Sequence, residues 1–527
     1  MSADFDVIVI GGGHNGLVSA AWLAKAGRKV LLLERRSALG GSASTEELFP
    51  GFHFNTGAAD AGLLQSSVIK ELDLHSHGLE FIDSRVAAFA PQPDGRALTL
   101  WRDPEKSSYE IAAHSANDAR AFLLFQQQNE RFAKLLTRYA GLRPPTIRNN
   151  SPGVLLAWVQ LALRLRGLGR RDMMEFLRVL PMSAYHYLNE HFEGDLLRGL
   201  LASVSVTGSM QGPRASGTAF MLLYQLMGTP NGSFRSSLVV RGGLGQLSAA
   251  LARAAKASGA VIKTTAPVQS ILSENGRVLG VRLQTGEGLR AKAVLSSADP
   301  HTTFLGLLGA PQLEPRFSRR LRSLKLRGST SSVHLALSAL PDFPAAAGEM
   351  QRLAGAIVIC PSLDYAEHAY DDAKVGRLSS QPIIEARIPS LLDPSLAPAG
   401  SHTLSMTVRY APYQLRESDW DAQRENLGDL AVETLSKVAL DLKSLILNRK
   451  VITPLDYERD YGLRQGSIMH GLMGLDQLLF MRPVPGFVGY RSPIDGLYLC
   501  GAGAHPGGGV TGAPGLNAAR QAHKELG

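Results

Sequence analysis

The chain opens on Phe5-Asp-Val-Ile-Val-Ile10, an apolar run that leads directly into Gly11-Gly-Gly-His-Asn-Gly16 and a helix-forming stretch at residues 17–26. The spacing Gly11-x-Gly13-x-x-Gly16 between a strand and a helix is the dinucleotide-binding fingerprint in its required context. Gly11 permits the tight turn, Gly13 lets a pyrophosphate approach the backbone, and Gly16 lets the helix pack against the strand. The N-terminus of that helix then offers free N–H groups to the phosphates.

A second apolar run, Lys29-Val-Leu-Leu-Leu-Glu34, ends in an acid eighteen residues after Gly16. A carboxylate at this distance can accept hydrogen bonds from an adenosine ribose. Gly242-Gly-Leu-Gly245 is similar to a second fingerprint, but Ser248 stands three positions beyond it and no acid ends the next strand. We therefore predict that this stretch begins a helix, and that the chain carries no second complete site for NADH.

The C-terminal part returns to glycine-rich sequence. The apolar stretch at residues 496–500 enters Gly501-Ala-Gly-Ala-His-Pro-Gly-Gly-Gly-Val-Thr-Gly512, and a helix is expected at residues 516–524. A glycine-dense turn between a strand and a helix exposes backbone N–H groups to a ligand. Two such turns at opposite ends of one chain predict one long cofactor held by both.

The composition describes a globular protein with more than one domain. The 527 residues allow ample cores, and 45% of them are apolar. The two cysteines, Cys360 and Cys500, cannot form a disulfide framework or a closely spaced redox pair. No signal peptide precedes the first strand and no apolar run can span a bilayer, so we expect a cytoplasmic protein. The net charge is +9, but no nucleic-acid-binding motif and no metal-ligand spacing is visible.

The pattern of strands and helices predicts an α/β fold. We expect a Rossmann-like cofactor domain assembled from discontinuous segments, together with a mixed α+β substrate domain that carries a helical insertion. The predicted boundaries assign residues 1–116, 229–309 and 460–527 to the cofactor domain, residues 117–228 to the insertion and residues 310–459 to the substrate domain. The basic run at residues 316–327 is interpreted as an amphipathic helix with a solvated face.

One helix in the insertion is apolar on every side. It covers residues 154–165, with Ser151 and Pro152 as its expected start, and Arg164, Arg166, Arg170 and Arg171 follow at once. Such a helix is either buried in the core or lies in a membrane interface, where cations meet anionic headgroups. Both alternatives stay open, so peripheral membrane contact is one of the partners that the sequence suggests.

At this point the residues resemble a family. Glu34-Arg-Arg-Ser-Ala-Leu-Gly40-Gly41 and the segment that begins at Gly501 are similar to motifs of FAD-dependent flavoproteins related to amine oxidases and phytoene desaturases. Asp476-Gln-Leu and Arg482-Pro-Val-Pro-Gly486 resemble a subgroup of that family. This subgroup contains bacterial phytoene-desaturase-like oxidoreductases and a mitochondrial pyridine nucleotide-disulfide oxidoreductase domain-containing protein. The resemblance is diffuse from residue 117 to 228 and from 310 to 459.

The resemblance implies FAD as the cofactor. It places Gly11, Gly13 and Gly16 against the pyrophosphate, Glu34 on the ribose and Arg36 along the adenine. It further implies contacts to FAD from the residues Gly40, Gly41, Val268, Gly501, Ala502, Gly509 and Val510. Many relatives have an arginine after the paired glycines, where this chain has Ser42.

The resemblance also implies an enzyme, an FAD-dependent oxidoreductase that acts on carbon–carbon bonds of an apolar, polyene or lipid-like substrate. His505 and His470 are the candidate proton acceptors, because imidazole titrates near neutral pH, and each can instead be a structural histidine. A flavin amine oxidase and an FAD-bound interaction protein without turnover are the alternatives. Cys500 ends a predicted buried strand, so we expect it to pack rather than to bind flavin covalently.

Overall fold

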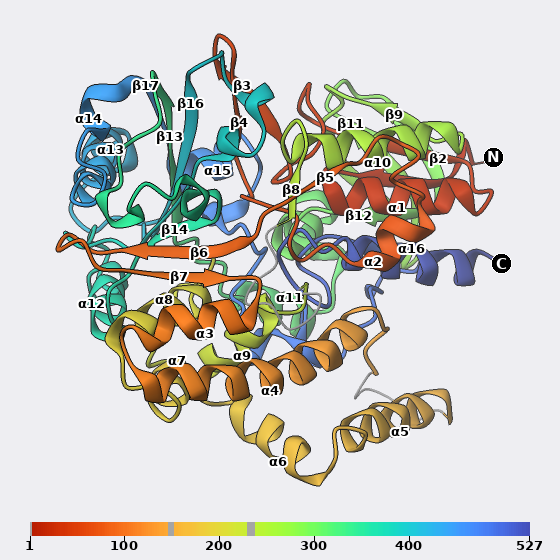
Figure 1. Cartoon of the computed structure of the whole chain (residues 1–527). Coiled ribbons are helices and arrows are strands. Elements are labelled where there is room, and N and C mark those ends of the chain that lie inside the picture. The colour runs from red at the N-terminus through yellow and green to blue at the C-terminus, as the bar shows by residue number, and fades with distance from the viewer. Residues whose placement is uncertain (1–2, 146–151, 229–237) are drawn as a thin grey trace.

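The computed structural model describes residues 3–145, 152–228 and 238–527. Two seven-stranded sheets lie apart in Figure 1, one at each side of the molecule, and most of the helical insertion lies below the second sheet. The chain has an α/β architecture, as predicted, with the nucleotide fingerprint in the first sheet. The predicted start of the apolar helix at Ser151 lies outside the described residues.

The first sheet is the Rossmann-like part. Its core consists of parallel strands in the order β9-β2-β1-β12-β18, and an antiparallel hairpin, β10-β11, continues from the first half of β12. Its strands are β1 (Phe5–Ile10), β2 (Val30–Leu33), β9 (Val261–Lys263), β10 (Val268–Glu274), β11 (Arg277–Leu283), β12 (Gly288–Ser296) and β18 (Leu497–Leu499). Both ends of the chain thus flank one strand, β12, because β1 and β18 pair with its two sides.

The second sheet has the order β17-β13-β16-β15-β14-β6-β7. Its strands are β6 (Val86–Pro91), β7 (Ala97–Trp101), β13 (Thr330–Leu337), β14 (Ala356–Ile359), β15 (Ile384–Arg387), β16 (His402–Arg409) and β17 (Ile446–Ile452). The strands expected at residues 331–337 and 402–409 are present. The hairpin β6-β7 pairs with β14 in this sheet, so this part of the range 1–116 does not belong to the Rossmann-like sheet. The other predicted domain boundaries stay predictions.

The remaining strands form two short ribbons between the sheets, and the helices cover them. The ribbons are β3 (Thr45–Phe49) with β4 (Phe52–Asn55) and β5 (Phe81–Asp83) with β8 (Leu238–Val240). The helices are α1 (His14–Lys25), α2 (Ser66–Glu71), α3 (Pro104–Ala112), α4 (Ala116–Ala140), α5 (Pro152–Arg166), α6 (Arg170–Val179), α7 (Ala184–Asn189), α8 (Asp195–Ser205), α9 (Thr218–Gln225), α10 (Gly245–Ala257), α11 (Pro315–Arg322), α12 (Leu363–Lys374), α13 (Trp420–Ser436), α14 (Leu442–Leu445), α15 (Pro454–Arg459) and α16 (Ala513–Leu526).

Two predictions about helices are confirmed and one needs a shorter range. Gly242-Gly-Leu-Gly245 does lead into a helix, α10. The basic run forms the amphipathic helix α11, with Phe317 and Leu321 buried and arginines on the other side, but the helix ends at Arg322. Within the described parts of the chain, no helix has the length and apolar character needed to cross a bilayer.

The first and last helices are packed directly against each other. A Cβ atom on Gly515 would lie 2.2 Å from the carbonyl oxygen of Asn15, so only glycine allows this approach. The Ser19 hydroxyl donates a hydrogen bond of 2.8 Å to the carbonyl of Gly515. In Figure 1, α1 and α16 lie side by side near the two chain ends. The two glycine-rich turns are therefore brought to the same edge of the sheet.

Candidate functional site

The turn after β1 has three glycines with three different structural requirements. Gly11 has φ +92°, and a Cβ there would lie 2.4 Å from Ser297 Oγ. A Cβ on Gly16 would lie 2.0 Å from the carbonyl oxygen of Gly11, so this glycine lets α1 pack against the turn. Gly13 has φ −67°, which any residue can adopt, and no protein atom lies nearer than 3.9 Å to its Cβ position. The fold itself therefore does not need glycine at position 13, and the space beside it is left for a ligand.

Glu34 is held in place at the end of β2 by backbone groups. Its Oε2 accepts a hydrogen bond of 2.6 Å from the Gly12 N–H, and its Oε1 accepts one of 2.8 Å from the Arg36 N–H. The side chain is buried, yet the residue lines the cavity described below. Each carboxylate oxygen can accept more than one hydrogen bond. Two lone-pair positions are thus available to the hydroxyl groups of a ribose.

Arg36 lies between an acid and an aromatic ring. Its Nη2 donates to Glu46 at 2.8 Å, and its guanidinium lies 4.4 Å from the ring centroid of Tyr461. Burial by itself would lower the pKa of Arg36, but the hydrogen bond and charge of Glu46 outweigh it and the pKa is raised. Nη1 is buried and has no hydrogen-bond partner among the described residues. This orphaned donor faces the region where an adenine base is expected.

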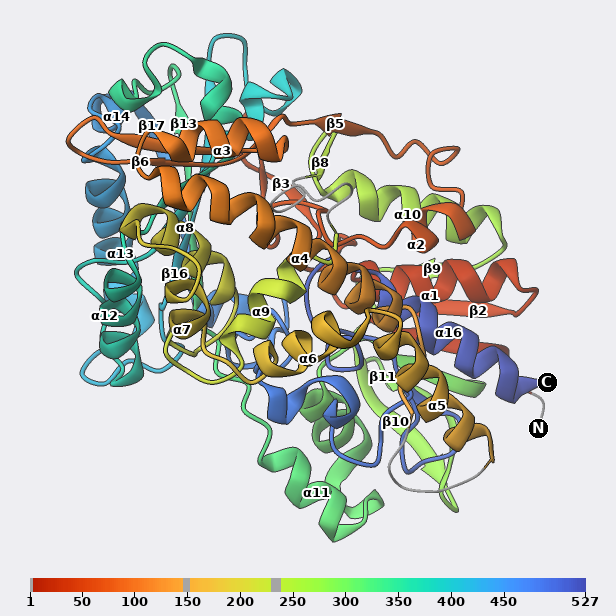
Figure 2. The same ribbon diagram turned by 60° about the horizontal axis from the view of Figure 1, so that its bottom comes forward.

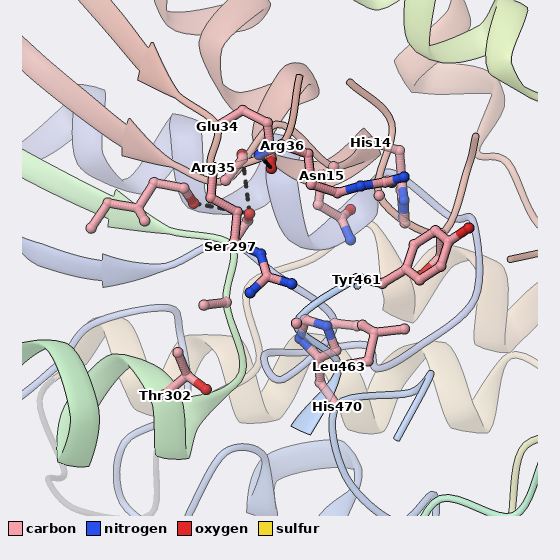
Figure 3. A pocket seen from close by; sticks show the side chains of 18 of the residues that line it. His14, Asn15, Glu34, Arg35, Arg36, Ser297, Thr302, Tyr461, Leu463 and His470 are labelled. Carbon is pink, nitrogen blue, oxygen red and sulfur yellow. Dashed lines mark hydrogen bonds between the residues drawn. The ribbon is translucent and has the colours of Figure 1, made fainter. Parts of the chain in front are cut away.

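These groups line one cavity of about 370 Å³, shown in Figure 3. It is built from the residues after β1, β2 and β12, from the segment after α15 and from the C-terminal glycine-rich turn. Nine of the predicted cofactor-binding residues line it: Gly11, Gly13, Glu34, Arg36, Gly41, Val268, Ala502, Gly509 and Val510. Gly16, Gly40 and Gly501 do not line it.

The three glycines that do not line the cavity are nonetheless required by its wall. A Cβ on Gly501 would lie 2.2 Å from the carbonyl oxygen of Ser297, and one on Gly40 would lie 2.7 Å from that of Ala43. Gly13 and Gly40 also form an isolated bridge between the two turns. Gly16, Gly40 and Gly501 therefore let backbone segments approach one another, and the direct contacts fall to their neighbours.

Sequence reasoning missed several lining residues. Ser297, Ala298 and Thr302 follow β12, and Tyr461 and Leu463 follow α15. Because the carboxyl ends of parallel strands meet at one edge, the small residues after the apolar strand β12 were a usable signal. No local signal marks Tyr461. Figure 3 shows Ser297 and Thr302 on one side of the site and Tyr461 on the other.

The structure does not bring His505 to the cavity. Its Nε2 lies 3.1 Å from the carbonyl oxygen of Tyr139, and its ring packs against the Tyr139 ring with centroids 4.7 Å apart. The residue is buried and absent from the cavity lining. This geometry fits the structural alternative, in which His505 ties the C-terminal turn to α4, and it does not support a role as proton acceptor.

His470 does line the cavity, and so does His14. Burial lowers the pKa of His470, and it lowers that of His14 to about 4. Both imidazoles are therefore neutral near pH 7 and keep one nitrogen able to accept a proton. The Nδ1 atom of His470 and the Nε2 atom of His14 are buried without a hydrogen-bond partner among the described residues. In Figure 3 the two side chains lie on opposite sides of one space.

Arg482 is a buried cation directly behind this part of the wall. Its guanidinium donates to the carbonyl oxygens of Ala502, at 2.9 Å, and of Leu472, Gln477 and Met469. Burial lowers the pKa of Arg482 to about 10, so the group stays charged near pH 7. Met469 and Ala502 both line the cavity. One side chain thus joins the segment that carries His470 to the C-terminal turn.

Replacing Arg482 by methionine is expected to lower the unfolding free energy by about 3 kcal/mol or more, because buried carbonyl groups lose their donors. The exposed Arg290→Met substitution is the matched control and should change stability by less than about 0.5 kcal/mol. Urea unfolding followed by circular dichroism measures both. Equal stability of the two variants would contradict the role given to Arg482.

Two buried histidines outside the cavity predict how stability depends on pH. Burial lowers the pKa of His334 and of His505 to about 4, whereas an unfolded histidine titrates near 6.5. The stability that depends on their neutral form is present above pH 6.5 and is lost as the pH falls toward 4. Each should lower the unfolding free energy at pH 5, relative to pH 7, by about 2 kcal/mol.

The His334→Asn variant tests this expectation. Its ring nitrogens lie 3.0 Å from Ser332 Oγ and 2.9 Å from Ser405 Oγ, and an amide can replace part of that hydrogen bonding. Urea unfolding at pH 7 and pH 5 should show a pH effect smaller by about 2 kcal/mol than in the parent protein. A variant with the parent's full pH effect would show that His334 does not contribute.

The two cysteines are unsuited to dithiol chemistry. Cys360 and Cys500 are both free and buried, and they lie in two separate hydrophobic clusters. Burial raises the pKa of each thiol to about 12, so neither is a thiolate near pH 7. Cys500 directly follows β18 and packs in the core of the Rossmann-like part, as expected.

Comparison with known proteins assigns the chain to a family. The model of the flavin-containing amine oxidoreductases matches residues 16–523. The chain belongs to this family. Its cofactor is therefore FAD, and the protein is an FAD-dependent oxidoreductase of the flavin-containing amine oxidoreductase family.

Three relatives show how this family member compares with others. It is 37% identical over 550 residues to the rat pyridine nucleotide-disulfide oxidoreductase domain-containing protein 2, covering 100% of this chain and 94% of the rat protein. It is 30% identical over 547 residues to a limonene dehydrogenase polypeptide of Castellaniella defragrans, covering 99% and 95%. It is 25% identical over 515 residues to a 4,4′-diapophytoene desaturase of Methylomonas, covering 96% and 92%.

A solved structure is similar in fold. An oxidoreductase from Methanosarcina mazei superposes with a TM-score of 0.60 at 16% identity, over 98% of this chain and 99% of that chain. The resemblance predicted from the sequence is thereby confirmed for the whole chain, including the two regions where the motifs are diffuse.

The residues of the cavity fit FAD. The open space beside Gly13 suits a pyrophosphate, the Glu34 carboxylate suits a ribose, and the orphaned Nη1 of Arg36 suits the adenine end. Ala502 and Val510, from the turn that precedes α16, suit the flavin end. The N-terminus of α16 directs its positive dipole end toward that turn, where it can stabilise negative charge on a reduced flavin.

Proposed function

We propose that the protein removes hydrogen from adjacent carbon atoms of an apolar, polyene or lipid-like substrate. The observation that carries the proposal is the chemistry of the cavity wall. Among the described residues that line the cavity, Glu34 is the only carboxylate and Tyr461 the only phenol, and both belong to the adenosine end. The wall near Ala502 is formed instead by apolar residues, which include Ala58, Ile468, Met469 and Val510.

This wall suits an uncharged substrate better than a protonated amine. A cation that leaves water needs a carboxylate or aromatic faces to compensate its lost hydration. Apolar side chains supply neither, but they bind a hydrocarbon through burial of apolar surface. The names of two relatives support the same direction, because they refer to a dehydrogenation of limonene and a desaturation of 4,4′-diapophytoene.

Bound FAD supplies the acceptor for one hydrogen with two electrons, while the other hydrogen leaves the neighbouring carbon as a proton and a carbon–carbon double bond forms. Oxygen or a quinone then takes up the two electrons. The chain holds the cofactor through the glycine turns and Glu34, and the apolar wall excludes water. We propose His470 as the proton acceptor, because it is neutral near pH 7 and its Nδ1 has no hydrogen-bond partner among the described residues.

Anaerobic bleaching of the flavin absorbance tests this proposal. The purified holoprotein is mixed with detergent-dispersed polyenes and terpenes, and in parallel with primary and secondary amines. We expect bleaching by members of the apolar set and none by the amines. Bleaching by amines alone would establish the amine oxidase alternative, and photoreduction without bleaching by any compound would establish an FAD-bound interaction protein.

The role of His470 has its own comparison. His470→Gln should slow bleaching by the best apolar substrate at least tenfold, since it removes the proton acceptor. His114→Gln is the matched control, because His114 is exposed and lies far along the chain on the helical side of β7. An unchanged rate in His470→Gln, with full FAD content, would overturn the assignment.

A further inference from the structure

Helices α5 and α6 lie at the periphery of the molecule. In Figure 1 they lie below the body, and in Figure 2 both lie on the face that is turned toward the viewer. No residue of α5 is buried. This excludes the interpretation of α5 as a core helix, although its sequence is apolar on every side. Its Trp158 ring packs against Phe480 of the body, with ring centroids 5.5 Å apart.

The pair of helices concentrates exposed apolar surface. Six of the thirteen large hydrophobic side chains that are exposed in the described chain lie on α5 and α6: Leu155, Leu156, Val159, Leu163, Met174 and Leu177. Leu163 is 62% exposed and Met174 is 58% exposed. Scattered exposed leucines are normal in soluble proteins, but a group of this kind marks an interaction surface.

The same helices carry cations without matching acids. Arg164, Arg166, Arg170 and Arg171 are exposed, and none of them forms an ion pair with another described residue. Residues 152–171 contain no acid. The first acids that follow are already paired, Asp172 with Arg131 and Glu175 with Arg178. The surface is therefore apolar and positively charged at once.

We propose that α5 and α6 dock the protein onto an anionic lipid bilayer, with both helices in the plane of the interface. Apolar side chains enter the boundary between headgroups and acyl chains, and neighbouring arginines meet anionic headgroups. A second copy of the chain is a poor occupant, because two such faces would bring like charges together. The docking helices fit the function proposed above, although the docking itself does not depend on it.

The docking surface is connected to the cavity. Phe480, which contacts Trp158, lies two residues before Arg482. Arg482 in turn holds the carbonyl groups of Met469 and Ala502, and both residues line the cavity. A membrane bound at α5 and α6 thus lies next to the segment that forms the apolar wall. This arrangement suits a substrate that is dissolved in the membrane.

Co-sedimentation of the FAD-loaded protein with vesicles tests the proposal. One set of vesicles is made of phosphatidylcholine alone and the other contains about 30% phosphatidylserine, so that only the second has an anionic surface. We expect binding to the anionic vesicles that weakens as salt rises. The triple reversal Arg164→Glu, Arg166→Glu and Arg170→Glu should lower the partition coefficient about a hundredfold, since each cation contributes roughly fivefold. The pair Leu155→Glu and Leu163→Glu should lower it at least tenfold.

Two control variants match these changes elsewhere on the surface. Lys437→Glu with Lys450→Glu reverses exposed cations, and Leu440→Glu with Leu447→Glu replaces exposed leucines near the second sheet. Neither control should alter vesicle binding. The flavin spectrum confirms that each variant is folded.

Three results would overturn the proposal. They are no vesicle binding at low salt, equal binding to both vesicle types, and dimers that dissociate in the α5 variants, which would assign the surface to a second copy. Bleaching by detergent-dispersed substrate, measured in the same variants, separates this outcome from the proposed function. Docking can fail while bleaching stays at the parent rate, and bleaching can be absent while vesicles still bind.

Discussion

Replacing Gly13 by alanine is expected to weaken FAD binding about a hundredfold while the chain still folds. Gly13 has a φ of −67°, and its Cβ position is 3.9 Å from the nearest protein atom. The added methyl group therefore meets no part of the protein and occupies the space of the pyrophosphate. Forcing a methyl group into a filled contact costs about 3 kcal/mol, which is roughly a hundredfold in affinity.

Titration of the apoprotein with FAD, followed by flavin fluorescence, measures this effect. Gly288→Ala is the matched control, because the Cβ of that exposed glycine also meets nothing within 4 Å and the residue is not in the cavity lining. Gly16→Ala provides the contrast, since its Cβ would lie 2.0 Å from the Gly11 carbonyl oxygen and should disturb the turn itself. Parent-like FAD affinity in Gly13→Ala would mean that the pyrophosphate does not lie there.

Replacing Glu34 by alanine is expected to have the second large effect. The change removes the acceptor for the ribose and leaves the N–H groups of Gly12 and Arg36 without their carboxylate. A hydrogen bond to a charged group contributes about 1.5–3 kcal/mol, so two of them account for at least a hundredfold loss of FAD affinity. Equilibrium dialysis against FAD measures the loss.

Glu47→Ala is the control for Glu34→Ala. Glu47 is an exposed acid that also accepts a backbone hydrogen bond, from the Gly51 N–H at 2.7 Å, but it does not line the cavity. Its removal should leave FAD affinity within about twofold of the parent value. If Glu34→Ala retained FAD as well as Glu47→Ala does, the adenosine end of the cofactor would have to lie elsewhere.

The parts of the site that the sequence predicted are those that depend on local geometry. The turn at Gly11, the acid at Glu34 and the C-terminal turn before α16 each follow an apolar strand, and each has one short pattern that imposes its conformation. Their convergence also followed from sequence, because parallel strands of one sheet present their carboxyl ends together. The structure places all three around one cavity.

The parts that the sequence missed depend on contacts between distant residues. The pairing of β6 with β14 joins residues more than 260 positions apart, and neither strand carries a mark of its partner. Tyr461 reaches the cavity only because the segment after α15 lies beside Arg36. His505 sits in a cofactor-type loop by sequence, yet its ring turns to the carbonyl of Tyr139 on α4.

The apolar helix shows the same limit in another form. Residues 154–165 have the composition of a buried helix, and composition alone cannot tell a core from an interface. The decision lies in the exposure of Leu155, Leu156 and Leu163, which is a property of the surrounding body and not of the helix.

The central claim is that one FAD molecule is held jointly by the first and last segments of the chain. Heat or acid release from the purified protein, followed by chromatography of the supernatant, tests this most directly. We predict FAD, released without a covalent link, at one molecule for each chain. Release of FMN or NAD in its place, or a correctly folded protein that takes up no FAD, would contradict the claim.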